Sequence, residues 1–335
     1  MACAPILAAL LLALAAPAVP AAAAGDFGYL HALPAAADGQ RVVVDTRPLA
    51  ECRTRTLAGA RCLPADDLFG PQRRLPSARD LLWLLGTAGL AGNETVWVVG
   101  HDPEARDFVA GLLHVAGQRE VRIVTEPVVR ALAGGAPAGP GRERAMVRET
   151  VFEAPMRDEL LVLLPELRAM RAMPALLDGR SDREYWGESA RAARTGHLPG
   201  AISLPAVQLR AALDAVADRR PVLPQGRPVV YAHDAFEGLA YLSLLVAGHG
   251  VAARLYAEGW AEWAADGALP ADAVGYPGTG ALRAAGSPVE SAASAVGAAS
   301  GSVGRQREAL MAGGAALLLA VLAGGWWLAT RRAPR

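Results

Sequence analysis

The chain has 335 residues, a formal net charge of zero and only three cysteines. This length leaves room for two domains of ordinary size. The balanced charge does not suggest a surface for nucleic acid, and so few cysteines exclude a scaffold built on several disulfides or a cysteine-rich zinc module.

The first 24 residues have the pattern of a secretory signal peptide. Residues 5–24 are apolar and end in three alanines, so cleavage would leave Gly25 as the first residue of the mature chain. Cys3 precedes the apolar run and would be removed with it. Because the α-amino group is the only positive charge ahead of that run, an uncleaved amino-terminal anchor is the alternative.

Two copies of one pattern occupy residues 26–275, which indicates two similar domains in tandem. We place the first domain at 25–126, a connector rich in Gly, Pro and Arg at 127–152, and the second domain at 153–275. The residues that recur between the copies are Asp45 and Arg47 as Asp178 and Arg180, His101 and Asp102 as His233 and Asp234, and Gly117 as Gly248.

Each copy alternates short β-branched runs with helical stretches, which predicts an α/β fold with a mainly parallel sheet flanked by helices in each domain. The apolar runs predict buried strands, and apolar residues at helical spacing predict the helices between them. The predicted strands are 42–44, 96–99, 121–124, 229–231 and 254–256, and the predicted helices are 108–116 and 239–247.

The carboxy-terminal part is predicted to contain a flexible linker at 276–304, a transmembrane helix at 309–330 and a cytoplasmic tail at 331–335. The 22 residues of the apolar segment carry no charge, and about 20 apolar residues span a bilayer as a helix. The segment ends in Trp326 and Trp327, typical of a membrane interface, and arginines follow. A buried core helix is the alternative. The expected location is the inner (plasma) membrane, single-pass, with the domains in the periplasm or outside the cell.

The second copy resembles a rhodanese (sulfurtransferase) domain over essentially its whole length. The first copy is a degenerate version that keeps Asp45, Arg47 and Glu51 but lacks the closing Gly-Trp element. The matching residues of the second copy are Asp178, Arg180, Glu184, Tyr185, Gly196, His197, Leu198, Pro199, Gly200, Ala201, Leu204, Pro205, Gly259, Trp260 and Trp263.

The resemblance implies a catalytic cysteine at the end of a strand, where loop amides and a helix amino-terminus would stabilise a thiolate and then a persulfide. Ala232 occupies this position in the second copy and Gly100 in the first. No cysteine lies between residues 63 and 335, so a shift of one or two residues in the alignment restores no nucleophile. We therefore predict that neither domain transfers sulfur by the route of its family.

The loops that follow these two positions are the candidate pseudo-active sites. Their residues are Ala232, His233, Asp234, Phe236, Glu237 and Gly238 in the second copy, and His101 and Asp102 in the first. We expect their carboxylates to cap the following helices; an anion or metal pocket is the alternative, and neither a metal nor a cofactor is predicted. Phe236 is interpreted as an exposed anchor at the apex of the loop, with a core position as its alternative.

Several other residues are given structural roles. Asp178 with Arg180, like Asp45 with Arg47, is expected to form an ion pair at the end of a strand, and Trp260 is expected in the core. Cys52 and Cys62 either form a disulfide, as an oxidising compartment would favour, or remain two buried thiols. Surface or helix-cap positions are expected for His31, His114 and His249.

The function predicted from these observations is that of a membrane-anchored, non-catalytic binding or scaffold module. Its partner would be an unidentified protein or a small anion, since inactive domains of the family serve as interaction modules. The alternative is an enzyme or carrier of the sulfurtransferase class that uses Cys52 or Cys62. A purely structural protein of the cell envelope is the third possibility.

Overall fold

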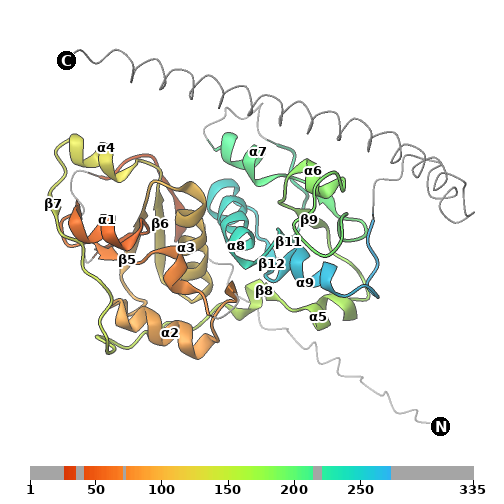
Figure 1. Ribbon diagram of the computed structural model, residues 1–335, viewed down its shortest axis with the longest axis horizontal. Coiled ribbons are helices and arrows are strands. Elements are labelled where there is room, and N and C mark those ends of the chain that lie inside the picture. The colour runs from red at the N-terminus through yellow and green to blue at the C-terminus, as the bar shows by residue number, and fades with distance from the viewer. Residues whose placement is uncertain (1–25, 35–40, 71–72, 214–220, 273–335) are drawn as a thin grey trace, which may run out of the picture. The chain divides into compact units, whose positions relative to one another are not determined.

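The computed structural model describes residues 26–34, 41–70, 73–213 and 221–272 (Figure 1). The predicted signal peptide at 1–24, linker at 276–304, membrane segment at 309–330 and tail at 331–335 lie outside these residues. Within the part of the chain that is described, no helix is long and apolar enough to cross a membrane.

The first half of the chain forms a five-stranded parallel sheet in the order β1-β6-β5-β2-β4. Its strands are β1 (Phe27–Leu30), β2 (Arg41–Asp45), β4 (Arg61–Cys62), β5 (Thr95–Val99) and β6 (Glu120–Val124). Its helices are α1 (Leu49–Thr54), η1 (Ala65–Leu68), α2 (Ala78–Thr87), α3 (Pro103–Val115) and α4 (Val128–Ala133).

The second half forms another five-stranded parallel sheet, in the order β10-β9-β11-β12-β8. Its strands are β8 (Leu161–Val162), β9 (Leu176–Asp178), β10 (Ile202–Ser203), β11 (Val229–Tyr231) and β12 (Arg254–Tyr256). Its helices are η3 (Asp158–Leu160), α5 (Leu164–Ala169), α6 (Asp182–Tyr185), α7 (Ala206–Ala211), α8 (Ala235–Ser243), the π-turn η5 (Leu244–Gly248) and α9 (Gly259–Ala265).

The two sheets have the same topology, and the predicted α/β architecture with parallel sheets is confirmed. When each is followed from its first strand in the chain, β1-β6-β5-β2-β4 corresponds to β8-β12-β11-β9-β10. Strand register extends this correspondence to single residues. Asp45 pairs with Val99 in the first sheet, and Asp178 pairs with Tyr231 in the second. Equivalent positions in the two halves can therefore be identified from hydrogen bonding alone.

Side chains alternate between the two faces of each sheet, as the period of a strand requires. In β5, Val96 and Val98 belong to the core beneath α2 and α3, whereas Trp97 and Val99 belong to a second core beneath α4. Both faces are covered, which explains why the strands appear in the sequence as nearly continuous apolar runs.

Residues 127–152 contain two elements of regular structure. Helix α4 covers one face of the first sheet, and β7 (Ala138–Gly139) pairs antiparallel with β3 (Thr56–Leu57). This segment therefore belongs structurally to the first half.

The two halves share one continuous core, which contains buried residues from α3 and α8. The helices approach closely at Gly111, where a Cβ would lie 2.5 Å from the carbonyl oxygen of Leu239. Ser243 donates a hydrogen bond to the carbonyl oxygen of Asp107 (2.7 Å), and Arg210 pairs with the Asp107 carboxylate. These contacts pack the middle of α3 against the middle and the end of α8.

Candidate functional site

The loop after β11 contains the candidate site of the second half. β11 ends at Tyr231, and Ala232 follows with only 2% of its surface exposed. Asp234 then caps α8, because its Oδ1 accepts hydrogen bonds from the N–H groups of Phe236 (3.0 Å) and Glu237 (3.1 Å). The first N–H groups of a helix have no helical partners, and Asp is a preferred residue to satisfy them. The prediction that this loop caps its own helix is confirmed.

Glu237 turns back onto the same loop. Its Oε2 accepts hydrogen bonds from the N–H of His233 (3.4 Å) and from Arg191 Nη2 (2.9 Å), while its Oε1 accepts one from Arg191 Nη1. Arg191 Nε also donates to Glu184 (2.7 Å). The carboxylate of Glu237 thus occupies a place, between a loop amide and a guanidinium, that suits an anionic ligand.

These contacts change the pKa values of the groups involved. Hydrogen bonds to Glu237 raise the pKa of Arg191. Burial alone would raise the pKa of Glu184, but hydrogen bonds from Arg191 and Ser181 lower it. Burial and the nearby positive charge of Arg191 lower the pKa of His233. The lowered pKa values favour an ionised Glu184 carboxylate and a neutral His233 imidazole at neutral pH.

The start of α9 closes the loop from the other side. The N–H of Trp260 donates to the carbonyl oxygen of Ala232 (3.0 Å), and the N–H of Ala261 donates to that of His233 (2.8 Å). Gly259 has a φ of +57°, and a Cβ there would lie 2.5 Å from the oxygen of Ala232. Glycine is required at this position because both the backbone conformation and the close approach exclude a side chain.

Arg180 contacts the residues that pack beneath this loop. Its guanidinium makes a bidentate pair with Asp178, with contacts of 2.5–3.1 Å, and it donates to the carbonyl oxygen of Gly196 (2.8 Å). Tyr231 donates to the same aspartate (2.7 Å). The ring of Trp260 lies 4.7 Å from the Arg180 guanidinium carbon and is 2% exposed. The predicted ion pair and the predicted core position of Trp260 are confirmed.

The first half keeps the ion pair but not the space for a side chain after its strand. Arg47 pairs with Asp45 through Nη2 at 2.7 Å, as predicted. Gly100 follows β5, and a Cβ at this position would lie 2.3 Å from Thr46 Oγ1. His101 is exposed, and Asp102 caps α3 through the N–H of Glu104 (3.0 Å).

The structure does not expose Phe236, so its interpretation as a free anchor at the loop apex is wrong. Its ring lies 5.0 Å from the ring of Phe108 and 6.2 Å from that of Phe69, both in the first half. Arg73 lies over Phe69 at 4.8 Å. Phe236 therefore contributes to the contact between the halves, which is the core alternative. This contact joins segments that lie far apart in the sequence, so no local sequence pattern could predict it.

The two loops also influence each other electrostatically. Burial raises the pKa of Glu104, and the negative charges of Glu237 and Asp102 raise it further. The halves thus bring their acidic loop residues close together. Spacing in the sequence did not reveal the partner of Glu237, because Arg191 lies 46 residues away.

Cys52 and Cys62 form a disulfide, with their Cα atoms 5.8 Å apart. Both are buried, and a Cβ at Gly141 would lie 2.4 Å from Cys62 Sγ, so the backbone of this glycine covers the bridge. Neither cysteine has the thiolate that it would need to carry sulfur in this structure, because a disulfide sulfur is not a nucleophile.

Two histidines have contacts that the sequence did not predict. His114 is buried and stacks on Phe27 at 4.3 Å, contrary to the expected surface or cap position. Burial lowers its pKa to about 3, assisted by the positive charge of Arg157. His249 Nε2 lies 2.9 Å from the carbonyl oxygen of Leu209. No group of three or more metal-ligating side chains occurs among the residues that the structure describes.

The model of the rhodanese-like domain family matches residues 163–266, the part of the chain that contains the loop described above. Residues 163–266 are a rhodanese-like domain. A search of curated proteins found no match.

Solved structures extend the similarity across both halves. A protein described as a "Probable Thiosulfate Sulfurtransferase" is 27% identical, with a TM-score of 0.53, and the match covers 72% of this chain and 99% of that one. Wild-type EanB is 19% identical, with a TM-score of 0.55, over 72% of this chain and 65% of EanB. YnjE is 18% identical, with a TM-score of 0.56, over 71% and 64%. The last two show the fold alone, and this chain spans about two thirds of their length.

Proposed function

We propose that the chain is a tandem pair of rhodanese-like domains that has lost sulfur transfer and acts as a binding module outside the cytoplasm. The observation that carries the proposal is the loop at Ala232. It retains the strand, the tight loop and the helix amino-terminus of a persulfide-stabilising site, but a buried methyl group stands where a thiol is needed.

The rest of the loop supports the loss of chemistry. Sulfur transfer requires a thiolate that attacks the sulfur donor, and neither Ala232 nor Gly100 can supply one. The amides that would stabilise an anionic intermediate already donate to Asp234 and Glu237. In the first half a Cβ at position 100 would lie 2.3 Å from Thr46 Oγ1, so any side chain there would require Thr46 to move.

Thiosulfate:cyanide sulfurtransferase activity of the purified full-length chain tests this proposal. We expect thiocyanate release no greater than that of a heat-inactivated control. Ala232→Cys should also stay at that level, because the carboxylates of Asp234 and Glu237 would raise the pKa of the new thiol. Thiocyanate release by the wild-type chain clearly above the control would show that the chain is a sulfurtransferase.

We also propose an extracytoplasmic location, with residues 309–330 as the membrane anchor. The Cys52–Cys62 disulfide supports an oxidising compartment, and the apolar sequence of residues 309–330 supports the anchor. Protease added to intact spheroplasts should digest the domains, and a chain truncated before Arg305 should be released in soluble form. Recovery of that truncated chain in the membrane fraction would contradict the assignment of the anchor.

A further inference from the structure

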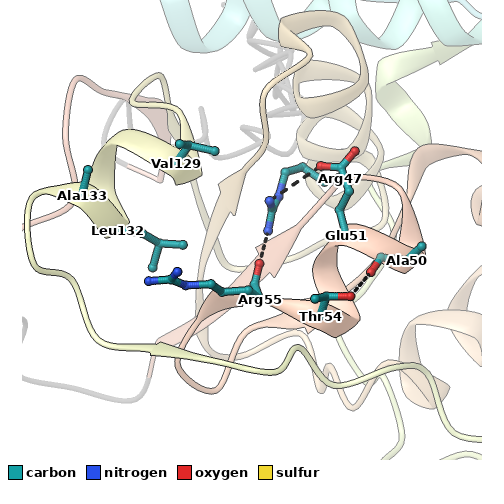
Figure 2. Close-up of a pocket in the computed structure, with 8 residues that line it drawn as sticks. All are labelled: Arg47, Ala50, Glu51, Thr54, Arg55, Val129, Leu132 and Ala133. Atoms are coloured by element: carbon teal, nitrogen blue, oxygen red, sulfur yellow. Dashed lines mark hydrogen bonds and ion pairs between the residues drawn. The ribbon is translucent and has the colours of Figure 1, made fainter.

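A pocket of about 630 Å³ lies between α1 and α4 in the first half, away from the loops described above (Figure 2). This volume lies within the range of ligand pockets in proteins. Its walls are mostly apolar on the α4 side and polar on the α1 side. The lining residues are Arg47, Ala50, Glu51, Thr54, Arg55, Val129, Leu132 and Ala133.

The corresponding helices of the second half, α6 and α9, enclose an aromatic ring. The ring of Trp260 in α9 lies 4.7 Å from the guanidinium carbon of Arg180 and 5.8 Å from that of Arg194. Its indole N–H donates to the carbonyl oxygen of Arg194 (3.2 Å). At the corresponding helices of the second half, an indole ring therefore lies beside two arginines.

Strand register shows that the first half lacks this ring. Val99 and Tyr231 are equivalent because each pairs with the aspartate of the ion pair. The residues before them, Val98 and Val230, are equivalent as well, and they pair with Ile123 in β6 and Leu255 in β12. Val124 and Tyr256, one residue further along these strands, are therefore also equivalent. Four residues beyond these positions stand Val128 and Trp260.

The consequence is a loss of bulk in one layer. The core beneath α9 contains Tyr185, Tyr231, Tyr256, Trp260 and Trp263, whereas Trp97 is the only large aromatic residue in the described core beneath α4. Aromatic side chains each bury 150–250 Å², so the buried valines at these positions give the layer beneath α4 less bulk than the layer beneath α9.

The arginine that faces the ring is nevertheless held in the same way. Arg47 Nη2 donates to Asp45 (2.7 Å) and to the carbonyl oxygen of Arg55 (2.8 Å), just as Arg180 donates to Asp178 and Gly196. Figure 2 shows the Arg47 guanidinium directed toward the Arg55 backbone at one side of the pocket. The orientation of this planar group is therefore fixed in advance of any ligand.

Arg55 supplies a second guanidinium. Its side chain lines the pocket and is exposed, and among the described residues it forms no ion pair. Glu51 lies 3.7 Å from Arg47 and offsets one of the two positive charges. Arg47 is also paired with Asp45, so the exposed guanidinium of Arg55 is the cation that remains for a ligand. A cation beside apolar walls favours an electron-rich aromatic ring, because cations are attracted to the face of such a ring.

We propose that this pocket binds the indole ring of a tryptophan that projects from a partner polypeptide. The inference rests on the proposed role as a binding module and names the chemistry that the module recognises. The pocket opens at the surface beside Val129, which is 69% exposed, so a side chain carried on another chain can enter between the helices. Tryptophan in a pocket is also a frequent centre of protein interfaces.

Fluorine NMR of a peptide probe tests the proposal on the full-length chain. The probe is Gly-Gly-Trp-Gly-Gly with 5-fluorotryptophan, whose resonance broadens on binding. We expect broadening by the wild-type chain, competition by the unlabelled peptide and no competition by Gly-Gly-Leu-Gly-Gly. Free indole should compete more weakly than the peptide; competition by indole alone, with no effect of the unlabelled peptide, would overturn the assignment of a polypeptide partner.

Two variants locate the binding. Val128→Trp restores the residue of the second half and should abolish broadening, whereas Val147→Trp, at a 73% exposed position, should leave it unchanged. Arg55→Glu should weaken binding about fivefold through loss of a cation–π contact, and the exposed control Arg171→Glu should not. Arg55→Glu changes an exposed side chain, so it remains informative even if Val128→Trp fails to fold.

Equal broadening by the leucine peptide, or binding unaffected by both pocket variants, would overturn the inference. Either result can be obtained while thiocyanate release stays at background, so this inference and the proposed loss of sulfur transfer fail separately.

Discussion

Glu237 and Arg191 lie 46 residues apart in the sequence, and two hydrogen bonds join their carboxylate and guanidinium groups. The same carboxylate accepts a hydrogen bond from the loop that follows β11. One side chain therefore both neutralises the arginine and holds the loop in place.

Glu237→Gln should destabilise the protein by about 1 kcal/mol, because the Arg191 side chain is 44% exposed and solvent screens the ion pair. Urea unfolding followed by circular dichroism measures the change. Glu188→Gln is the matched control, since its contact with Arg183 is 3.8 Å long and both side chains are exposed. Equal effects of the two substitutions would show that Glu237 is no more than a surface charge.

His114 should make stability fall as the pH is lowered. Its pKa is about 3 in the folded protein and 6.5 when unfolded, so the unfolded state binds the proton first and stability is lost below pH 6.5. Between pH 7.5 and 5 we expect the wild type to lose roughly 2 kcal/mol more than His114→Phe, measured by urea unfolding at both pH values. His101→Gln, at an exposed position, should behave as the wild type. Parallel losses in the wild type and His114→Phe would contradict a buried neutral imidazole.

Reduction of the Cys52–Cys62 bridge should lower the stability of the first half. The sequence separation is 10, and closing so short a loop contributes about 2–3 kcal/mol by the chain-entropy estimate. Unfolding with and without dithiothreitol measures this contribution, and the Cys52→Ala, Cys62→Ala variant should be insensitive to the reductant. Alkylation of both thiols in the unreduced protein, detected by mass spectrometry, would exclude the bridge.

Gly100→Ala should cost about 1–3 kcal/mol, because the added methyl group overlaps Thr46 Oγ1. Thr46→Ala removes that oxygen. The double variant should therefore lose less stability than the sum of the losses of the two single variants. Gly267→Ala, where a Cβ meets no atom within 4 Å, is the control. Strictly additive single changes would show that the overlap is relieved elsewhere.

Local patterns predicted the central strands and the two helices that follow them. β5 and β11 stand where β-branched runs predicted them, and aspartates cap α3 and α8 as expected. Helix α8 is an exception in detail, because it changes to a π-turn after Ser243. The hydroxyl of Ser243 donates to the carbonyl oxygens of Leu239 and Asp107, and such bonds to the preceding turn bend helices.

Contacts between distant segments were not predictable in the same way. The resemblance predicted that Ala232 and Gly100 stand where the family has cysteine. Spacing could not reveal that Arg191 would reach Glu237 or that Phe236 would pack on Phe108. The pocket beside Arg47 lies next to a core layer that lacks most of the aromatic side chains of the second half. Only strand register, which aligns Val124 with Tyr256, makes that difference visible.

The close packing of α3 on α8 at Gly111 has a consequence for biosynthesis. The chain is made from its amino-terminus, so α3 is complete more than one hundred residues before the helix that covers it. During that interval the face of α3 that carries Phe108 and Gly111 lacks the helix that covers it, and apolar surface of this kind favours aggregation. We therefore expect the first half, produced without the second, to accumulate in insoluble form.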